Sequence, residues 1–127
     1  INRTQVHAAL DTLENLRKNG RIGAAGSLLG SMLSIKPIIE VRGGVVEPAG
    51  KQRTRSKALN YLISVVESNA DQIDQIFVCH AACDDVDSFV EQVESLVNVE
   101  VFVGQIGPVV GAHAGIATIG VALQTTN

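Results

Sequence analysis

The order strand, helix, strand between residues 73 and 106 constrains the fold of this chain more than any other feature. Residues 73–80 (IDQIFVCH) have the apolar composition of a buried strand, and residues 99–106 have the same character. Between them, Asp84 and Asp85 precede a segment whose apolar residues share one helical side. A strand, a helix and a strand in this order form a βαβ unit with parallel strands and a right-handed crossover. The chain is therefore predicted to have an α/β fold.

A β-hairpin and a closing strand are predicted to complete a mixed sheet. Residues 36–42 (KPIIEVR) are typical of a strand, Gly43 and Gly44 of a tight turn, and residues 45–47 of the returning strand. The two hairpin strands are expected to pair antiparallel. Residues 116–123 supply a closing strand, so the prediction is a mixed sheet with a βαβ unit and a β-hairpin, flanked by helices.

Two helices are predicted in the first half of the chain. Apolar residues recur at helical spacing in residues 6–16, and Gly20 is a typical terminating residue. Residues 1–20 are therefore predicted to form a lead-in helix that ends near Asn19. Residues 51–68 (KQRTRSKALNYLISVVES) are predicted to form a helix with one apolar face.

Residues 23–35 (GAAGSLLGSMLSI) combine small residues with a larger apolar face. Small residues such as Ala25, Gly26 and Gly30 allow the close approach of another helix or of an extended ligand. The larger apolar side chains on this face are Leu28, Leu29, Met32 and Leu33. They pack either in the protein core or against an apolar ligand.

Composition limits the function classes. The 127 residues suffice for one domain with a core, and 46% hydrophobic with 18% charged residues is typical of a folded chain. A net charge of −3 gives no support for nucleic-acid binding. The apolar runs are shorter than the roughly 20 residues that membrane insertion requires. Only two cysteines suit a reducing, cytoplasmic compartment.

A metal site is not expected. Cys79, His80 and Cys83 form the pattern C-H-x-x-C. Zinc takes four ligands, or three with one open position, and no second Cys/His pair lies nearby in the sequence. The metal prediction is therefore none.

His113 lies among glycines and small apolar residues, in the stretch GPVVGAHAGIATIGVAL. A buried imidazole needs hydrogen-bond partners, and flanking glycines let another backbone or a ligand approach closely. His113 is thus either a satisfied core histidine or a ligand contact.

Four cations gather at the predicted start of the helix in residues 51–68, namely Lys51, Arg53, Arg55 and Lys57. A helix N-terminus carries partial positive charge, so cations there are locally unfavourable. Surface ion pairs explain them, or else a bound carboxylate, phosphate or acidic partner surface.

The sequence contains no complete catalytic constellation. Cys79 and His80 are strand neighbours that point to opposite faces. Small apolar residues combined with cations and a histidine favour binding of an amphiphile with a carboxylate head. Two alternatives stay open. One is a small-molecule enzyme or transferase that uses His80 and His113 at strand ends, and the other is a protein-interaction module centred on Arg53.

Four motifs follow one another in the order found in a known family. They are LDTLENLRKNGRIGAAGSLLGSMLSIKPIIEVRGGVVEP, KQRTRSKAL with its RT-x-x-KA pattern, the strand IFVCHA that ends in histidine, and IGPVVGAHAGIATIGVA. Over nearly the whole chain they resemble the carboxyl-terminal domain of the DegV proteins. These proteins bind fatty acids and serve as lipid-carrying subunits of bacterial fatty acid kinases.

The resemblance implies that residues 1–127 are one domain of a two-domain protein whose amino-terminal domain is absent from this sequence. The full-length protein would enclose a long-chain fatty acid and present its carboxylate to a separate ATP-binding kinase subunit. The chain itself would then be no enzyme, and the fatty acid would be its ligand in place of a cofactor.

The resemblance also assigns site residues. His113 matches the family's carboxylate-contacting histidine, and Arg53 matches the arginine beside the head group and the kinase-facing surface. Arg55 is expected to share in partner binding. The expected tail contacts are Leu28, Leu29, Met32 and Leu33.

Overall fold

The computed structural model describes residues 4–10, 36–42, 44–81, 83–105 and 118–126. The elements in these residues are, in chain order, β1 (Thr4–Ala9), β2 (Lys36–Arg42), β3 (Val45–Gln52), α2 (Arg55–Asn69), the 3₁₀ helix η2 (Ala70–Gln72), β4 (Ile73–His80), α3 (Val86–Glu94), β5 (Val101–Gln105) and β6 (Ile119–Thr125). The predicted α/β class is confirmed.

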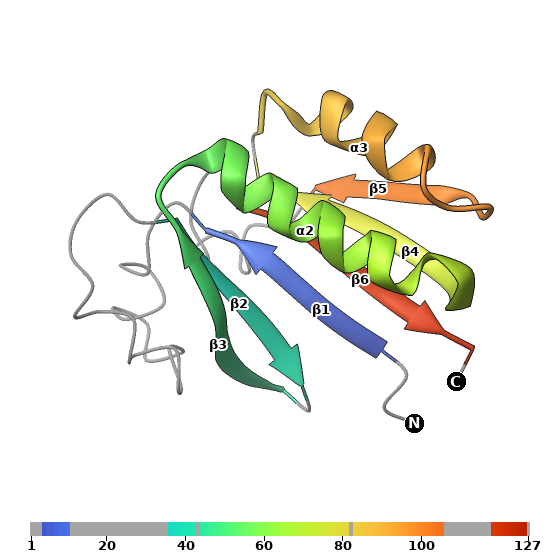
Figure 1. Cartoon of the computed structure of the whole chain (residues 1–127), viewed down its shortest axis with the longest axis horizontal. Helices are drawn as coiled ribbons and strands as arrows, with labels where there is room; N and C mark the ends of the chain where they lie inside the picture. Colours follow the sequence, from blue (N-terminus) through green and yellow to red (C-terminus); the bar gives the residue numbers. More distant parts are fainter. Residues whose placement is uncertain (1–3, 11–35, 43, 82, 106–117, 127) are drawn as a thin grey trace.

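The six strands form one mixed sheet in the order β3-β2-β1-β6-β4-β5 (Figure 1). Strands β4 and β5 run parallel and are joined through α3, as the predicted βαβ unit requires. The remaining neighbouring pairs are antiparallel, including the predicted hairpin of β2 and β3. The strand predicted in residues 116–123 is observed as β6, which covers Ile119–Thr125 and lies between β1 and β4, while residues 116 and 117 lie outside the described residues.

The hairpin turns at Gly44, one of the two predicted glycines, and is longer than predicted, whereas Gly43 lies outside the described residues. Gly44 has a φ of 79°, in the left-handed region that favours glycine. Strand β3 continues to Gln52, and an irregularity in its pairing lies between Ile38 and Ile39. As a consequence Lys51 belongs to β3, and the prediction that it lies at the start of the following helix is wrong.

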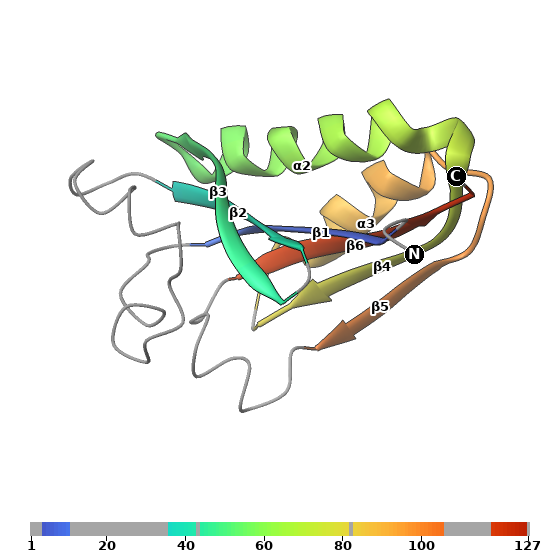
Figure 2. The same cartoon turned by 90° about the horizontal axis from the view of Figure 1, so that it is seen from below.

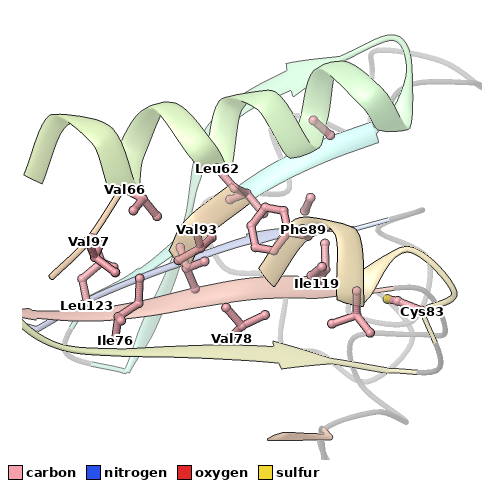
Figure 3. Close-up of a cluster of buried hydrophobic side chains, with 14 of the residues drawn as sticks. Leu62, Val66, Ile76, Val78, Cys83, Phe89, Val93, Val97, Ile119 and Leu123 are labelled. Carbon is pink, nitrogen blue, oxygen red and sulfur yellow. The ribbon is translucent and has the colours of Figure 1, made fainter. Parts of the chain in front are cut away.

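Both described α-helices cover the same face of the sheet (Figure 2). Leu62 of α2 and Phe89 and Val93 of α3 are almost fully buried, and they pack over strand residues such as Ile76 and Leu123 (Figure 3). The core therefore lies between the helices and one face of the sheet. Among the described residues no helix lies on the opposite face of the sheet, and we call that face the helix-free face.

The predicted lead-in helix in residues 1–20 is wrong in its first part. Residues Thr4–Ala9 form strand β1, which pairs with β2 on one side and β6 on the other. His7 and Ala9 lie on one face of this central strand and Thr4 and Val6 on the other, so polar and apolar residues occur on both faces and no alternation between them marks the strand. Hydrogen bonding on two sides then decides its conformation. Residues 11–20 lie outside the described residues.

Candidate functional site

The carboxyl ends of most strands lie at one edge of the sheet. Strands β1, β3, β4 and β5 end at this edge, whereas β2 and β6 run the opposite way and begin there. We call it the carboxyl edge, and it lies on the left in Figure 1. Ligands of α/β sheets commonly bind beyond the carboxyl ends of strands, so this edge is the first place to search for a site.

His113 belongs to residues 106–117, which lie outside the described residues. Strand pairing nevertheless places the chain on both sides of this segment. Gln105 and Ile119 both pair with His80, one from each side of β4. Neighbouring strands are about 4.8 Å apart, so the two ends of the segment straddle the carboxyl end of β4 at a separation of about 10 Å.

The predicted tail contacts lie in residues 11–35, which are also outside the described residues. This segment, too, joins the carboxyl edge at both ends, because the backbone N–H of Leu10 donates to the carbonyl of Pro37 at 2.9 Å. Two segments that carry predicted ligand residues therefore start and finish at the same edge. The residues concerned are His113 in one and Leu28, Leu29, Met32 and Leu33 in the other.

Arg53 lies at the carboxyl edge, between the end of β3 and the start of α2, and its side chain is exposed. The next residue, Thr54, caps α2 by accepting a hydrogen bond from the backbone N–H of Lys57 at 3.2 Å. In the part of the chain that the structure describes, no ion pair of Arg53 is recorded. Arg53 is therefore exposed at the carboxyl edge, the same edge to which the segment containing His113 is joined at both ends.

Arg55 has a different environment from Arg53. Its Nε donates to Oδ2 of Asp85 at 2.6 Å, and its Nη2 donates to Oδ1 at 3.0 Å, which makes a bidentate ion pair between the starts of α2 and α3. The hydrogen bond from Arg55 lowers the pKa of Asp85, and the same bond raises the pKa of Arg55. The acid that pairs with Arg55 is thus supplied by the chain itself.

Asp85 does not cap α3 with its side chain, although it precedes the first helical residue. Its carboxylate turns to Arg55 instead. Arg55 Nη2 also donates to the sulfur of Cys83 at 3.3 Å, and the thiol of Cys83 donates to the carbonyl of Thr118 at 3.2 Å. Thr118 is the first described residue after the segment that contains His113.

The helix-free face is apolar near the carboxyl edge. Its residues alternate along each strand with residues of the core, and cross-strand pairing aligns them into two rows. The row farther from the edge is Val46, Val41, Val6, Ala122, Phe77 and Phe102, one from each strand across the sheet. The row nearer the edge is Pro48, Ile39, Ala8, Gly120, Cys79 and Gly104. Neither row contains a charged residue.

Two aromatic rings stand at one end of the first row. Phe77 and Phe102 are stacked with ring centroids 5.3 Å apart, and they are 43% and 44% exposed. Most of the other residues in the two rows are less exposed, and Ile39 and Gly120 are buried. An exposed pair of aromatic rings beside further apolar residues is a candidate ligand or partner contact.

For the alternative of an enzyme that uses His80 and His113 at strand ends, few described residues could act together with His80. His80 Nδ1 is buried and has no hydrogen-bond partner recorded in the described structure, and Cys79 faces the other side of the sheet as expected for a neighbour. Burial raises the pKa of the Cys79 thiol, which disfavours a nucleophilic thiolate. Within the described ranges, no cluster of three or more His, Cys, Asp or Glu residues is arranged to hold a metal.

Sequence reasoning did not predict the hydrogen-bonded group of Arg55, Cys83 and Asp85. The partners are about 30 residues apart, and no spacing rule relates them. It also missed the apolar rows, although the exposed face of β4 could have been inferred from Phe77, which lies between the two core positions Ile76 and Val78. No described helix is both long and apolar enough to cross a membrane.

Comparison with known proteins gives a consistent assignment. A family model matches residues 1–126, and its description is "Uncharacterised protein, DegV family". A DegV domain-containing protein of Clostridium perfringens is 37% identical over 114 residues, which are 87% of this chain and 40% of that protein. The chain therefore spans less than half the length of this relative.

Solved structures agree with the sequence comparison. A DegV family protein from Thermus thermophilus, described for its fatty acid binding, matches 96% of this chain and 45% of its own with a TM-score of 0.85 and 29% identity. A stearic acid-binding protein from Eubacterium ventriosum matches 98% of this chain and 45% of its own, with a TM-score of 0.84 and 25% identity. The chain belongs to the DegV family.

Proposed function

We propose that the protein to which this chain belongs binds a long-chain fatty acid and presents its carboxylate to a separate ATP-binding kinase subunit. The observation that carries the proposal is the helix-free face, which is apolar in two rows across the sheet and ends at the edge where Arg53 is exposed. An amphiphile laid on this surface places its tail on apolar side chains and its head at the carboxyl edge.

The tail is assigned to the rows on the helix-free face and to the four predicted contacts Leu28, Leu29, Met32 and Leu33. Removing apolar surface from water contributes about 25 cal/mol per Å², so a long alkyl chain gains most of its affinity there. The structural relatives described as binding fatty acids support this choice of ligand.

The head group is assigned to His113 and Arg53. A fatty carboxylate takes a charge-assisted hydrogen bond from each, and bonds of this kind are about twice as strong as neutral ones. Arg53 also faces solvent, which suits a second role in contact with the kinase subunit. Arg55 is engaged by Asp85, so Arg53 is the stronger candidate of the two for that contact.

The chain spans 40% of the Clostridium perfringens relative and 45% of the Thermus thermophilus protein. We propose that the remaining part of the protein, its amino-terminal domain, encloses the ligand from the other side. The proposed role is that of a carrier in the cytoplasm, with catalysis in the kinase subunit and no resident cofactor.

The first test is to identify what the full-length protein retains from cells. The protein is purified without detergent, extracted with organic solvent and examined by mass spectrometry. A stoichiometric fatty acid is expected. A clean extract, together with no binding after fatty acids are added back, contradicts the proposal.

The second test separates the two head-group residues. His113→Ala in the full-length protein is expected to lower fatty-acid affinity about tenfold, because one charge-assisted bond is lost. Arg53→Glu is expected to weaken kinase-subunit binding as well, and in wild type that binding should weaken as salt rises. Unchanged affinity in His113→Ala contradicts the assignment of His113 to the head group.

A further inference from the structure

A continuous chain of hydrogen bonds joins the two parts of the carboxyl edge that carry the proposed head-group residues. It begins at the carbonyl of Thr118, which accepts from the backbone N–H of Ala81 at 2.9 Å and from the thiol of Cys83 at 3.2 Å. Thr118 is 2% exposed and Cys83 is 8% exposed, so both bonds are shielded from water. They fix the point at which the His113 segment returns to the sheet.

The chain of bonds continues from Cys83 to Arg55. Arg55 Nη2 donates to the Cys83 sulfur at 3.3 Å, and the same guanidinium donates two hydrogen bonds, of 2.6 and 3.0 Å, to the carboxylate of Asp85. A bidentate pair holds the planar guanidinium in one orientation, as a single-bonded ion pair does not. Arg55 thus links the first turn of α2 to the residues that follow β4.

Arg55 lies two residues after Arg53, with the helix cap Thr54 between them. Fixing the Arg55 side chain therefore also fixes the short junction that carries Arg53. One network thus reaches the backbone beside Arg53 at one end and the backbone after the His113 segment at the other.

We propose that Arg55, together with Asp85 and Cys83, is a positioning device that holds the Arg53 junction and the end of the His113 segment at a fixed separation, so that both residues meet one carboxylate. This inference rests on the proposed function, and it assigns to Arg55 a role different from partner contact. The three residues act through Arg53 and His113 and do not touch the ligand.

The test compares two ligands that differ only in the head group, hexadecanoic acid and hexadecan-1-ol, on the full-length protein freed of lipid. Wild type is expected to bind the acid more tightly. Arg55→Lys keeps the positive charge but removes the paired N–H donors of the guanidinium. Asp85→Asn keeps the shape of the side chain but removes its negative charge. Each is expected to lower affinity for the acid about tenfold and to leave affinity for the alcohol unchanged.

Asp84→Asn is the matched control, because Asp84 is an exposed acid one residue from Asp85 and forms no ion pair with another described residue. It should bind both ligands as wild type does. Cys83→Ser and Cys83→Ala form a second matched pair. Serine still donates to Thr118 and accepts from Arg55, so only the alanine variant is expected to lose preference for the acid.

The outcomes separate the two proposals. Equal weakening of acid and alcohol means that the network only maintains the fold, and an unchanged preference in every variant means that it positions nothing. Either result overturns the positioning role while fatty-acid binding by wild type stands. If wild type binds neither ligand, the proposed function fails, and the positioning role fails with it.

Discussion

At the scale of single residues, the centre of the sheet tolerates no side chain at Gly120. A Cβ built on Gly120 would lie 2.9 Å from the carbonyl oxygen of His7 and 3.2 Å from the Cβ of Ala8. Both contacts belong to the neighbouring strand β1, which is itself held by β2 on its other side. Neither neighbour is free to move away without breaking strand pairing.

Gly120→Ala is therefore expected to lower the free energy of unfolding by about 1 to 3 kcal/mol, the usual cost of overpacking. Urea denaturation monitored by circular dichroism measures the change. Gly104→Ala is the control, since the added Cβ would meet nothing within 4 Å. Equal effects of the two substitutions would show that loss of glycine, and not the close approach of β1, determines the result.

Residue identity predicted some of this chemistry and left out the rest. The hairpin turn at Gly44 was predictable from the sequence, because a turn depends on neighbouring residues. The pairing of Arg55 with Asp85 was not, because it requires the starts of two helices to meet in space. The glycine-rich setting of His113 left a core histidine and a ligand contact both open, and its assignment to the carboxylate, which rests on the family resemblance, stays a prediction.

At the scale of elements, the ion pair between Arg55 and Asp85 connects α2 to α3, and its contribution depends on pH. The pKa of Asp85 is lowered in the folded protein, chiefly by the hydrogen bond from Arg55. A carboxyl group with a depressed pKa stabilises the fold above its unfolded pKa of about 3.9, and this contribution is lost as the pH falls through the folded value.

Asp85→Asn is expected to be less stable than wild type at pH 7, by no more than about 1 kcal/mol because the pair is partly exposed. The difference should shrink below about pH 4 and vanish at lower pH, where wild-type Asp85 is protonated too. Urea unfolding at several pH values gives the curve. Asp84→Asn should follow wild type throughout, and a difference for Asp85→Asn that is independent of pH would exclude the ion pair as its cause.

The elements were predicted best where one face differs from the other. In α3, Phe89 and Val93 mark a buried side against exposed acids such as Glu91, so the helix was predictable. Strand β1 was missed because polar and apolar residues occur on both of its faces, and its apolar residues Val6 and Ala9 also fit helical spacing. Pairing with β2 and β6, which are distant in sequence, decided between the two.

At the scale of the whole molecule, positive and negative side chains lie at different parts of the carboxyl edge. Beyond Lys57 the sequence contains no Lys or Arg, so every positive side chain of these two types lies in the first part of the chain. In the described structure the positive residues near the edge therefore belong to β2, β3 and the start of α2, whereas α3 carries exposed acids such as Asp87 and Glu91. A carboxylate approaching the edge is attracted to the side of Arg53.

The position of the apolar rows predicts how affinity depends on the length of the fatty acid's alkyl chain. If the tail lies on the helix-free face, Phe77 and Phe102 contact its methylene groups, and each buried methylene contributes about 0.8 kcal/mol. The double substitution Phe77→Ala with Phe102→Ala in the full-length protein is then expected to weaken binding of a C18 acid by tenfold or more, which corresponds to the loss of about 1.4 kcal/mol or more of tail contact. Binding of a C10 acid is expected to weaken much less.

Isothermal titration with saturated acids of increasing length measures the gain in affinity per methylene in both proteins. Both rings are more than two fifths exposed, so their truncation leaves no large cavity in the core. Val45→Ala is the control, because Val45 is 52% exposed in the hairpin, at the end of β3 away from the carboxyl edge. Equal weakening at every chain length would place the tail elsewhere and leave the aromatic pair as a contact for another part of the protein.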